Sequence, residues 1–170
     1  EYEGGRPTSD RAREAVFNIL SSKLAGDWAA CDMLDVFAGT GAVGLEALSR
    51  GVRSVTLLDV NLQMARRNAA LFAKEKDRIS LISADASRLP PAPRQYNLVF
   101  LDAPYNKGLS VAALRSLAGQ GWLAEDALVL VELEKNEPLE MESIPFFEQV
   151  DERRYGLARV VFLHFLPAKK

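Results

Sequence analysis

The chain has 170 residues, with 21 Lys and Arg against 23 Asp and Glu, and 48% of its residues are hydrophobic. That length fits a single domain spanning 1–170, and the apolar fraction excludes a wholly disordered chain. A lone cysteine, Cys31, excludes an internal disulfide, and a lone histidine, His164, removes most histidine-based zinc chemistry. The apolar runs are too short to span a bilayer and no signal peptide is visible, so we expect a cytoplasmic protein.

Short apolar runs alternate with stretches of helical periodicity, which is the pattern of parallel β-α units. The expected helices are 11–24, with Asp10 as its N-cap, then 42–49, 62–72 and 111–117. The expected strands are 33–37, 55–58, 79–82, 96–101 and 127–133, followed by a hairpin of 146–150 and 159–165. Because the strands are rich in Val and Leu on both faces, we expect an α/β, doubly wound, Rossmann-like sheet of seven strands. The sheet should be mostly parallel, with an antiparallel C-terminal hairpin strand at its edge.

The first predicted strand ends in a glycine-rich loop that opens a helix. Its sequence from Asp35 to Gly44 contains a literal G-x-G-x-x-G, and Asp59 lies 20 residues beyond Gly39. This spacing matches the dinucleotide fingerprint, in which glycines admit the ligand and an acid binds the ribose. A carboxylate at Asp35 would repel a pyrophosphate, however, and would attract the sulfonium and ammonium groups of S-adenosylmethionine. The alternative is that the glycines merely shape a tight turn.

Two further acidic segments follow predicted strands. Asp85 comes after the third strand, where it could accept a hydrogen bond from an adenine amine or could simply cap a turn. The fourth strand ends in Asp102-Ala103-Pro104-Tyr105. Asp102 and the carbonyl of Ala103 can each accept an N–H of an exocyclic amine, which would aim the nitrogen lone pair at an electrophile. Pro104 would fix the backbone and Tyr105 could stack on the base.

These motifs resemble those of class I S-adenosylmethionine-dependent methyltransferases. The Asp102–Tyr105 stretch is similar to the Asp/Asn-Pro-Pro-Tyr/Phe motif of enzymes that methylate exocyclic amines. The opening Arg6-Pro7-Thr8, the Asp-Val-Phe-Ala-Gly-Thr-Gly loop and the Arg154-Tyr155-Gly156 turn resemble the bacterial 16S ribosomal RNA methyltransferases that act on N2 of guanine 966. The chain departs from this family in having Ala103 in place of a proline, and a short basic segment usually precedes Arg6.

The resemblance implies methyl transfer from S-adenosylmethionine to a guanine N2 of 16S ribosomal RNA, by a monomer acting on a partly assembled small subunit, with no metal and no membrane. The implied cofactor contacts are Asp35, Phe37, Gly39, Thr40, Gly41, Asp59, Val60, Asp85 and Ala86. The implied catalytic residues are Asp102, Ala103, Pro104 and Tyr105. Three alternatives stay open: a methyltransferase of DNA adenine or protein glutamine, a nicotinamide-dependent oxidoreductase, and a catalytically silent RNA scaffold that binds the cofactor.

The net charge of −2 by itself argues against a nucleic-acid partner, but the charges are unevenly distributed. Residues 125–152 hold ten acidic residues and one basic residue, which leaves 20 basic and 13 acidic residues elsewhere. We therefore expect a solvated acidic face over 125–152 and a basic RNA footprint on the remaining surface. The predicted footprint comprises Arg6, Arg11, Arg13, Arg50, Arg53, Arg66, Arg67, Arg88 and Arg94.

Overall fold

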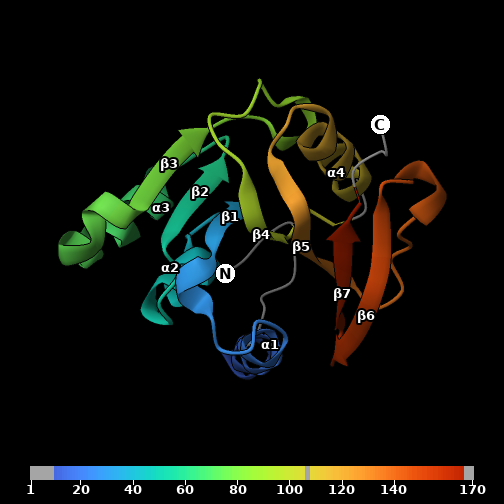
Figure 1. Cartoon of the computed structure of the whole chain (residues 1–170), viewed down its shortest axis with the longest axis horizontal. Helices are drawn as coiled ribbons and strands as arrows, with labels where there is room; N and C mark the ends of the chain where they lie inside the picture. The colour runs from blue at the N-terminus through green and yellow to red at the C-terminus, as the bar shows by residue number, and fades with distance from the viewer. Residues whose placement is uncertain (1–9, 106–107, 167–170) are drawn as a thin grey trace.

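The computed structural model describes residues 10–105 and 108–166, and Figure 1 shows their arrangement. The strands are β1 (Asp32–Val36), β2 (Ser54–Asp59), β3 (Ile79–Ser83), β4 (Tyr96–Leu101), β5 (Leu123–Glu134), β6 (Phe147–Tyr155) and β7 (Ala158–Phe165). The α-helices are α1 (Asp10–Lys23), α2 (Ala42–Ser49), α3 (Gln63–Ala69) and α4 (Leu109–Gly119). Short 3₁₀ segments are η1 (Trp28–Ala30), η2 (Ala70–Arg78), η3 (Ala86–Arg88) and η4 (Met141–Ser143). The opening Arg6-Pro7-Thr8 motif lies outside the described residues.

The strands form one seven-stranded sheet in the order β3-β2-β1-β4-β5-β7-β6. Strands β1 to β5 pair in parallel, whereas β7 runs antiparallel to both β5 and β6. The doubly wound, mostly parallel sheet with an antiparallel hairpin strand is therefore confirmed. The strand order reverses between β1 and β4, and open α/β sheets bind ligands beyond the strand ends at such a switch point.

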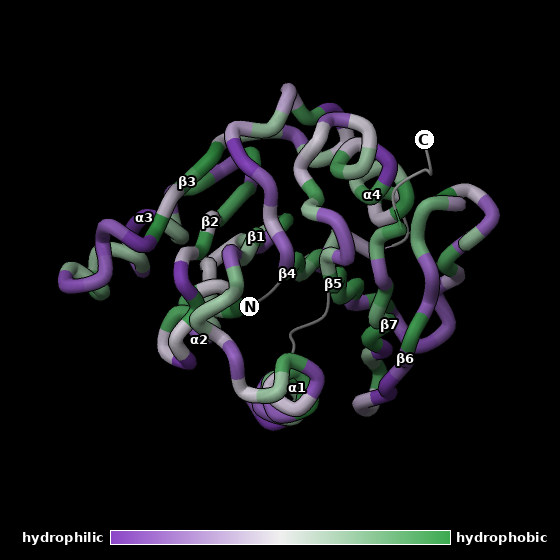
Figure 2. The backbone as a smooth tube through the Cα atoms, in the orientation of Figure 1, coloured by the Kyte–Doolittle hydropathy of each residue, from purple (hydrophilic) through white to green (hydrophobic). Residues whose placement is uncertain are grey.

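Both faces of the sheet are covered, because successive residues of the central strands point into two different cores. Met33, Leu57 and Leu98 pack in one core with side chains of α1, α2 and α3. Their neighbours in the strands pack in the other, with α4 and η3. This explains why the strands are apolar on both faces. Figure 2 shows the result, with hydrophobic residues along β2 and β7 and hydrophilic ones around α3.

The structure differs from the predicted elements where polar residues dominate. The helix expected over 62–72 ends at Ala69, and 3₁₀ turns continue to Arg78 across a non-helical Phe72. In α3 only Ala65 is buried, and η2 buries no side chain, so little apolar surface holds a regular helix there. Asp10, expected as an N-cap, is the first helical residue, and its carboxylate accepts a hydrogen bond from Arg13 at 3.0 Å.

The C-terminal hairpin is longer than predicted. Strand β6 continues through the polar run that ends at Tyr155, because Arg153 and Arg154 pair in register with Val160 and Arg159 of β7. The register shifts at Val150, where β6 carries an irregularity. Such a bulge, together with charged residues, protects an edge strand against pairing with another chain. Within the described residues, no helix is long and apolar enough to cross a membrane.

Candidate functional site

The loops that follow β1, β2, β3 and β4 meet beyond the C-terminal ends of these strands and enclose a cavity of about 450 Å³. That volume is in the range of pockets that hold a small ligand. The predicted site residues that line the cavity are Phe37, Gly39, Asp59, Val60, Asp85, Ala86, Asp102 and Pro104. Residues from four separate loops are therefore brought together by the parallel strands, as expected at the switch point of such a sheet.

The glycine loop is held in place from the neighbouring strand β2. The two carboxylate oxygens of Asp59 accept the backbone N–H groups of Gly39, at 2.8 Å, and of Val60, at 2.7 Å. Gly39 has a positive φ of 55°, and a Cβ built on it would meet no atom within 4 Å, so its outer side is open to a ligand. Phe37 also has a positive φ, 60°, which is strained for a side chain of this size. The loop thus presents exposed backbone to the cavity in a fixed conformation.

Asp35 lies behind this loop. Its side chain is buried and its Oδ2 accepts the backbone N–H of Gly44 at 3.0 Å. It does not line the cavity. The pKa of Asp35 is raised to about 8, chiefly because burial penalises the charged form; the Gly44 hydrogen bond opposes the rise, and the charges of Asp102 and Asp59 add to it. This raised pKa favours the neutral form of the carboxyl at neutral pH, and the expected attraction between its charge and a cationic ligand stays a prediction. Direct contact between Asp35 and a cofactor stays a prediction.

The hydrogen bond from Gly44 gives Asp35 a clear structural role at the start of α2. The N-cap of this helix is Gly41, whose left-handed backbone carries no side chain that could accept the first N–H groups. Asp35 accepts the N–H of Gly44, and the Oγ1 of Thr40 accepts that of Ala42 at 3.3 Å. Thr40 and Gly41 support the loop in this way, and neither lines the cavity. These contacts fix the helix N-terminus against β1.

Asp85 caps a turn and also lines the cavity. Its Oδ1 accepts both the backbone N–H and the hydroxyl of Ser87, at 2.9 and 2.7 Å, so it caps the η3 turn. These hydrogen bonds lower the pKa of Asp85, chiefly through the Ser87 hydroxyl. The carboxylate also lines the cavity beside Ala86. An ionised acceptor at this position suits a ligand N–H, and the predicted contact with an adenine amine stays a prediction.

The segment after β4 divides into two parts. Asp102 and Pro104 line the cavity, whereas the Ala103 side chain is 6% exposed and packs in the core with residues of β4 and α4. Tyr105 is 43% exposed and does not line the cavity. Acceptance of an amine by the Ala103 carbonyl and base stacking on Tyr105 stay predictions.

Sequence reasoning missed four residues of the cavity wall: Leu58, Ala84, Ser87 and Leu109. Leu58, Ala84 and Ser87 are each next in the sequence to a predicted site residue, so the predicted residues already located this part of the wall. Leu109 begins α4, which folds back over the cavity, and nothing in its local sequence distinguishes it from a core leucine. A second cavity, of about 610 Å³, lies between α4, η4 and the ends of β6 and β7 and contains none of the predicted site residues.

The charges of the cavity select among the ligands considered. Three carboxylates, Asp59, Asp85 and Asp102, line it, and among its described lining residues there is no lysine or arginine. Such a surface attracts a cationic ligand and repels a pyrophosphate. The cavity therefore fits an S-adenosylmethionine sulfonium better than a dinucleotide.

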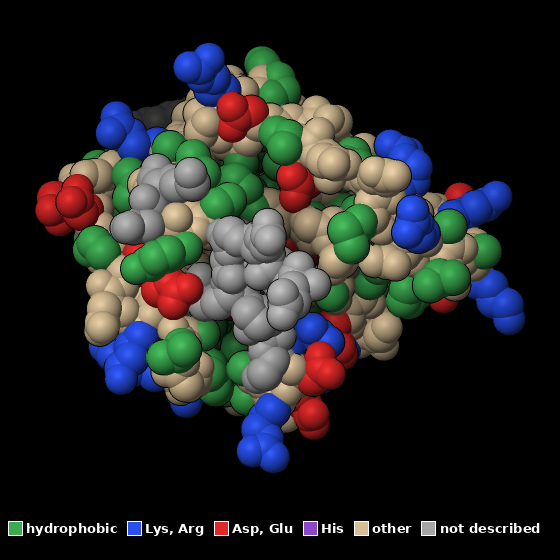
Figure 3. Space-filling model, turned by 180° about the vertical axis from the view of Figure 1, so that it is seen from behind, with side chains coloured by type: hydrophobic (Ala, Val, Ile, Leu, Met, Phe, Trp, Pro, Cys, Tyr) green, Lys and Arg blue, Asp and Glu red, His purple; other side chains and the backbone are tan. Residues whose placement is uncertain are grey.

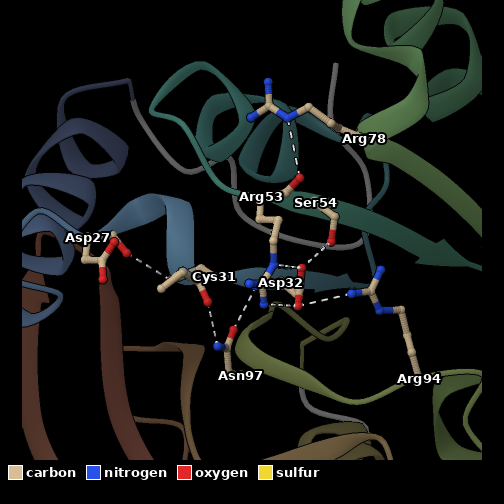
Figure 4. Close-up of polar contacts among 9 residues, drawn as sticks. Asp27, Cys31, Asp32, Arg53, Ser54, Arg78, Arg94 and Asn97 are labelled. Atoms are coloured by element: carbon tan, nitrogen blue, oxygen red, sulfur yellow. Dashed lines mark hydrogen bonds and ion pairs between the residues drawn. The ribbon is translucent and has the colours of Figure 1, made fainter.

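Two arginines of the predicted basic footprint lie away from the cavity. Arg53 and Arg94 both contact Asp32, the first residue of β1 (Figure 4). They therefore lie at the N-terminal ends of the strands, whereas the cavity lies beyond the C-terminal ends. Two N–H groups of Arg53 bind the carboxylate at 3.0 and 2.6 Å, and Arg94 approaches it at 3.1 Å. Both arginines therefore lie away from the cavity, while their side chains stay about half exposed, and their contact with RNA stays a prediction. Arg6 lies outside the described residues.

Three arginines of the predicted basic footprint lie on elements that adjoin the cavity, two on α3 and one on η3. Arg66 and Arg67 are exposed on α3, which begins shortly after the cavity residue Val60. Arg88 is exposed and directly follows Ser87 in the cavity wall. These three arginines are called the mouth arginines below.

Three acids of the segment 125–152 are buried or paired within the fold. Glu132 is 2% exposed within the sheet. Asp151 binds Lys23 at 2.7 Å and Arg153 at 3.0 Å, and Glu152 binds Arg159 at 2.6 Å. Ion pairs therefore neutralise part of the negative charge. The mostly solvated character expected of the segment still holds for Glu125, Asp126, Glu140, Glu142 and Glu148, which are exposed.

Comparisons with known proteins agree with this fold and site. The family model described as Conserved hypothetical protein 95 matches residues 1–164. The ribosomal RNA small subunit methyltransferase D of Haemophilus influenzae is 35% identical over 143 residues, covering 81% of this chain and 72% of that protein. The structure of yhhF from Escherichia coli, a provisionally assigned methyltransferase, has a TM-score of 0.79 at 30% identity, covering 98% of this chain and 91% of that one.

A more distant structural neighbour shares the fold alone. The N-methyltransferase NodS from Bradyrhizobium japonicum, solved with S-adenosyl-l-homocysteine, has a TM-score of 0.69 at 14% identity. The alignment covers 94% of this chain and 89% of NodS. The doubly wound sheet of this chain is thus also the fold of an enzyme that binds the methyl-transfer product of S-adenosylmethionine.

Proposed function

Since the chain belongs to the family described as Conserved hypothetical protein 95, with a ribosomal RNA small subunit methyltransferase D among its relatives, we propose that it methylates 16S ribosomal RNA. The methyl group comes from S-adenosylmethionine, and the acceptor is the exocyclic N2 of a guanine. The observation that carries this proposal is the cavity in which Asp102 and Pro104 face Asp59 and the glycine loop. A cofactor site and an amine-recognition segment share that cavity.

The residues of the cavity fit this cofactor. Asp59 lies at the end of β2, where an acid can bind ribose hydroxyls, and Asp85 can accept the adenine amine. Gly39 leaves its outer side open to the ligand, and Phe37 and Val60 supply apolar surface. When bound, S-adenosylmethionine supplies an electrophilic methyl group on a positively charged sulfur. The three cavity carboxylates stabilise that positive charge.

Asp102 has the central chemical role in this proposal. Its carboxylate would accept an N–H of the guanine amine and orient the nitrogen lone pair toward the methyl carbon. It would receive the amine proton once the N–C bond has formed and the S–C bond has broken, with S-adenosylhomocysteine as the leaving group. Pro104 holds the neighbouring backbone, which also directs the Ala103 carbonyl toward the amine. In-line transfer of this kind depends on alignment and on exclusion of water more than on a strong base.

The substrate must present an unstacked guanine. A base inside a helix has to leave its stack to enter such a cavity, which costs a few kcal/mol unless it is already unpaired. A folded loop of 16S ribosomal RNA in a partly assembled small subunit in the cytoplasm meets this requirement. We also propose that the protein acts as a monomer.

The test is methyl transfer from labelled S-adenosylmethionine to several acceptors in parallel. Small subunits from a strain that lacks its own enzyme should be methylated, whereas free DNA and a protein glutamine amide should not. Transfer to DNA or protein instead would replace the RNA assignment with another amine methyltransferase. Tighter binding of NAD than of S-adenosylhomocysteine would overturn the cofactor assignment.

A further inference from the structure

Asn68 connects helix α3 to the glycine loop. Its side-chain amide Nδ2 donates a hydrogen bond to the backbone carbonyl of Thr40 at 2.9 Å. One turn earlier on α3, the buried Ala65 packs against the same loop, since a Cβ added to Gly41 would lie 3.6 Å from its side chain. Helix α3 therefore supports the back of the loop at two points.

The Thr40 carbonyl belongs to a short turn whose other backbone groups are also fixed. The N–H of Gly41 donates to the carbonyl of Ala38 at 2.7 Å, and the N–H of Gly39 donates to Asp59 at 2.8 Å. Asn68 therefore holds the carbonyl side of the Thr40–Gly41 peptide, and the Ala38 carbonyl holds its N–H side. The hydrogen bonds from Asp59 and Asn68 together fix the loop conformation that exposes Gly39 to the cavity.

Asn68 is not required to satisfy the Thr40 carbonyl. Thr40 is exposed, so a water molecule can donate a hydrogen bond to its carbonyl in place of Asn68, at little cost in stability. Asparagine is also a weaker helix former than alanine, so its presence within α3 carries a local cost. Asn68 therefore lowers helix stability and replaces a hydrogen bond that water could supply. Its main contribution is to restrict the glycine loop to one conformation.

We propose that Asn68 is a positioning residue for the cofactor, acting through the Thr40 carbonyl to preorganise the glycine loop. This inference rests on the proposed function, because it takes the cavity beside the loop as the cofactor site. Asn68 does not line the cavity and makes no contact with the reacting atoms. Its removal should therefore weaken ground-state and transition-state binding of the cofactor equally, which raises KM and leaves kcat unchanged.

The expected effect corresponds to the loss of one hydrogen bond that orders the loop. Asn68→Ala should raise the Kd for S-adenosylhomocysteine about three- to tenfold. Asn68→Asp keeps the shape of the side chain but removes its donor and turns an oxygen toward the Thr40 carbonyl. This variant should weaken binding at least as much. Because Asn68 is partly exposed, both variants should melt within about 4 °C of the wild type.

The experiment measures Kd for S-adenosylhomocysteine by calorimetry, together with KM for S-adenosylmethionine, kcat on small subunits and the melting temperature. Gln63→Ala is the matched control, since Gln63 is exposed on the same helix and its side chain does not contact the loop in the described structure. The proposal predicts a higher Kd and KM for both Asn68 variants, with kcat within twofold of wild type and no change for Gln63→Ala.

Asp59→Ala distinguishes failure of this inference from failure of the proposed site. If Asp59→Ala weakens binding and both Asn68 variants bind like the wild type, Asn68 has no positioning role and the site stands. If Asp59→Ala also binds like the wild type, the cofactor site is misassigned and the inference fails with it. A fall of more than about 10 °C in melting temperature with unchanged Kd would make Asn68 purely structural.

Discussion

Asp35 is the buried carboxyl behind the glycine loop. The sequence places this acid at the end of the first strand, and from its position we predicted that its charge selects a cationic ligand. In the structure the carboxyl is buried, accepts the N–H of Gly44, and has a pKa raised to about 8. The selecting charges are instead Asp59, Asp85 and Asp102 in the cavity wall. Sequence shows which residues follow strands, but not how deeply each side chain is buried.

The raised pKa of Asp35 predicts a pH-dependent stability. Between its ordinary value of 3.8 and about 8, the unfolded chain releases this proton while the folded protein retains it. Stability must therefore fall as pH rises through this window and stay reduced above it. Asp35→Asn keeps an acceptor for Gly44 and cannot ionise, so it should gain stability over the wild type by up to several kcal/mol as pH rises from 4 to 9.

Urea unfolding of both proteins at several pH values measures this difference. The extra amide hydrogens of Asn add an offset that does not depend on pH, so the slope rather than the absolute value is diagnostic. A difference between the two proteins that stays constant from pH 5 to 9 would mean that Asp35 is ionised throughout.

Asp102 is the residue whose replacement should separate chemistry from cofactor binding. Asp102→Ala removes the acceptor that orients the amine, so methyl transfer should fall at least about 100-fold. S-adenosylhomocysteine is uncharged at sulfur, and its Kd should change less than about threefold. Single-turnover transfer and calorimetry measure the two quantities. Transfer that survives the substitution would contradict the assigned role, and a wild type without turnover would support a silent scaffold.

Helix α2 shows how a glycine sets the position of a whole element. A Cβ on Gly44 would lie 2.5 Å from Leu57, 2.9 Å from Val55 and 3.2 Å from the Asp35 carboxylate. Leu57 and Val55 are buried in β2, so they have little freedom to move aside. The third glycine of the motif thus permits α2 to pack closely on the sheet, which aims its N-terminus and the preceding loop at the cavity.

Gly44→Ala should therefore destabilise the protein by about 1 to 3 kcal/mol through overpacking, and should displace the loop that Asp35 and Asp59 hold. The matched control is Gly119→Ala at the end of α4, where an added Cβ meets nothing within 4 Å. Alanine is the better helix former, so this control should leave stability equal or slightly higher. Chemical denaturation measures both. Equal stability of the two variants would contradict the close approach.

The sequence predicted elements well where apolar residues repeat and poorly where polar residues dominate. Strands β1 and β4 were located within one residue, because each is a short, buried and mainly apolar run. Helix α3 was extended too far, since its pattern of apolar residues continues to Phe72 although η2 buries nothing. The positive φ of Phe37 could not be predicted at all, because only the packing of the assembled loop imposes it.

The whole molecule determines which of its charges can meet RNA. Counting residues predicted one basic footprint, whereas the fold sends Arg53 and Arg94 to the far sheet edge and pairs Asp151 with Lys23. In the view of Figure 3, lysine and arginine side chains are spread around the rim with acidic and apolar groups between them. Sequence order gives the total charge of a segment, but only the fold decides which charges share a surface.

The mouth arginines should contribute the salt-dependent part of RNA binding. Arg88→Ala should weaken binding of the small subunit several-fold and make its salt dependence shallower, because one phosphate contact is lost. Lys76→Ala removes the same charge just before β3 begins, at the end of the strand away from the cavity. This substitution should have little effect on RNA binding. Affinities measured between 50 and 200 mM salt test this map. Equal effects of the two substitutions would contradict it.

The most direct test of the central claim is the identity of the methylated product. After reaction with S-adenosylmethionine and small subunits that lack the modification, the 16S ribosomal RNA is digested and its nucleosides are separated and identified by mass. We predict that N2-methylguanosine appears with the wild type and that the Asp102→Ala variant produces none. A methyl group on another base, on a ribose, or at N2 of guanine in the variant as well would contradict the account.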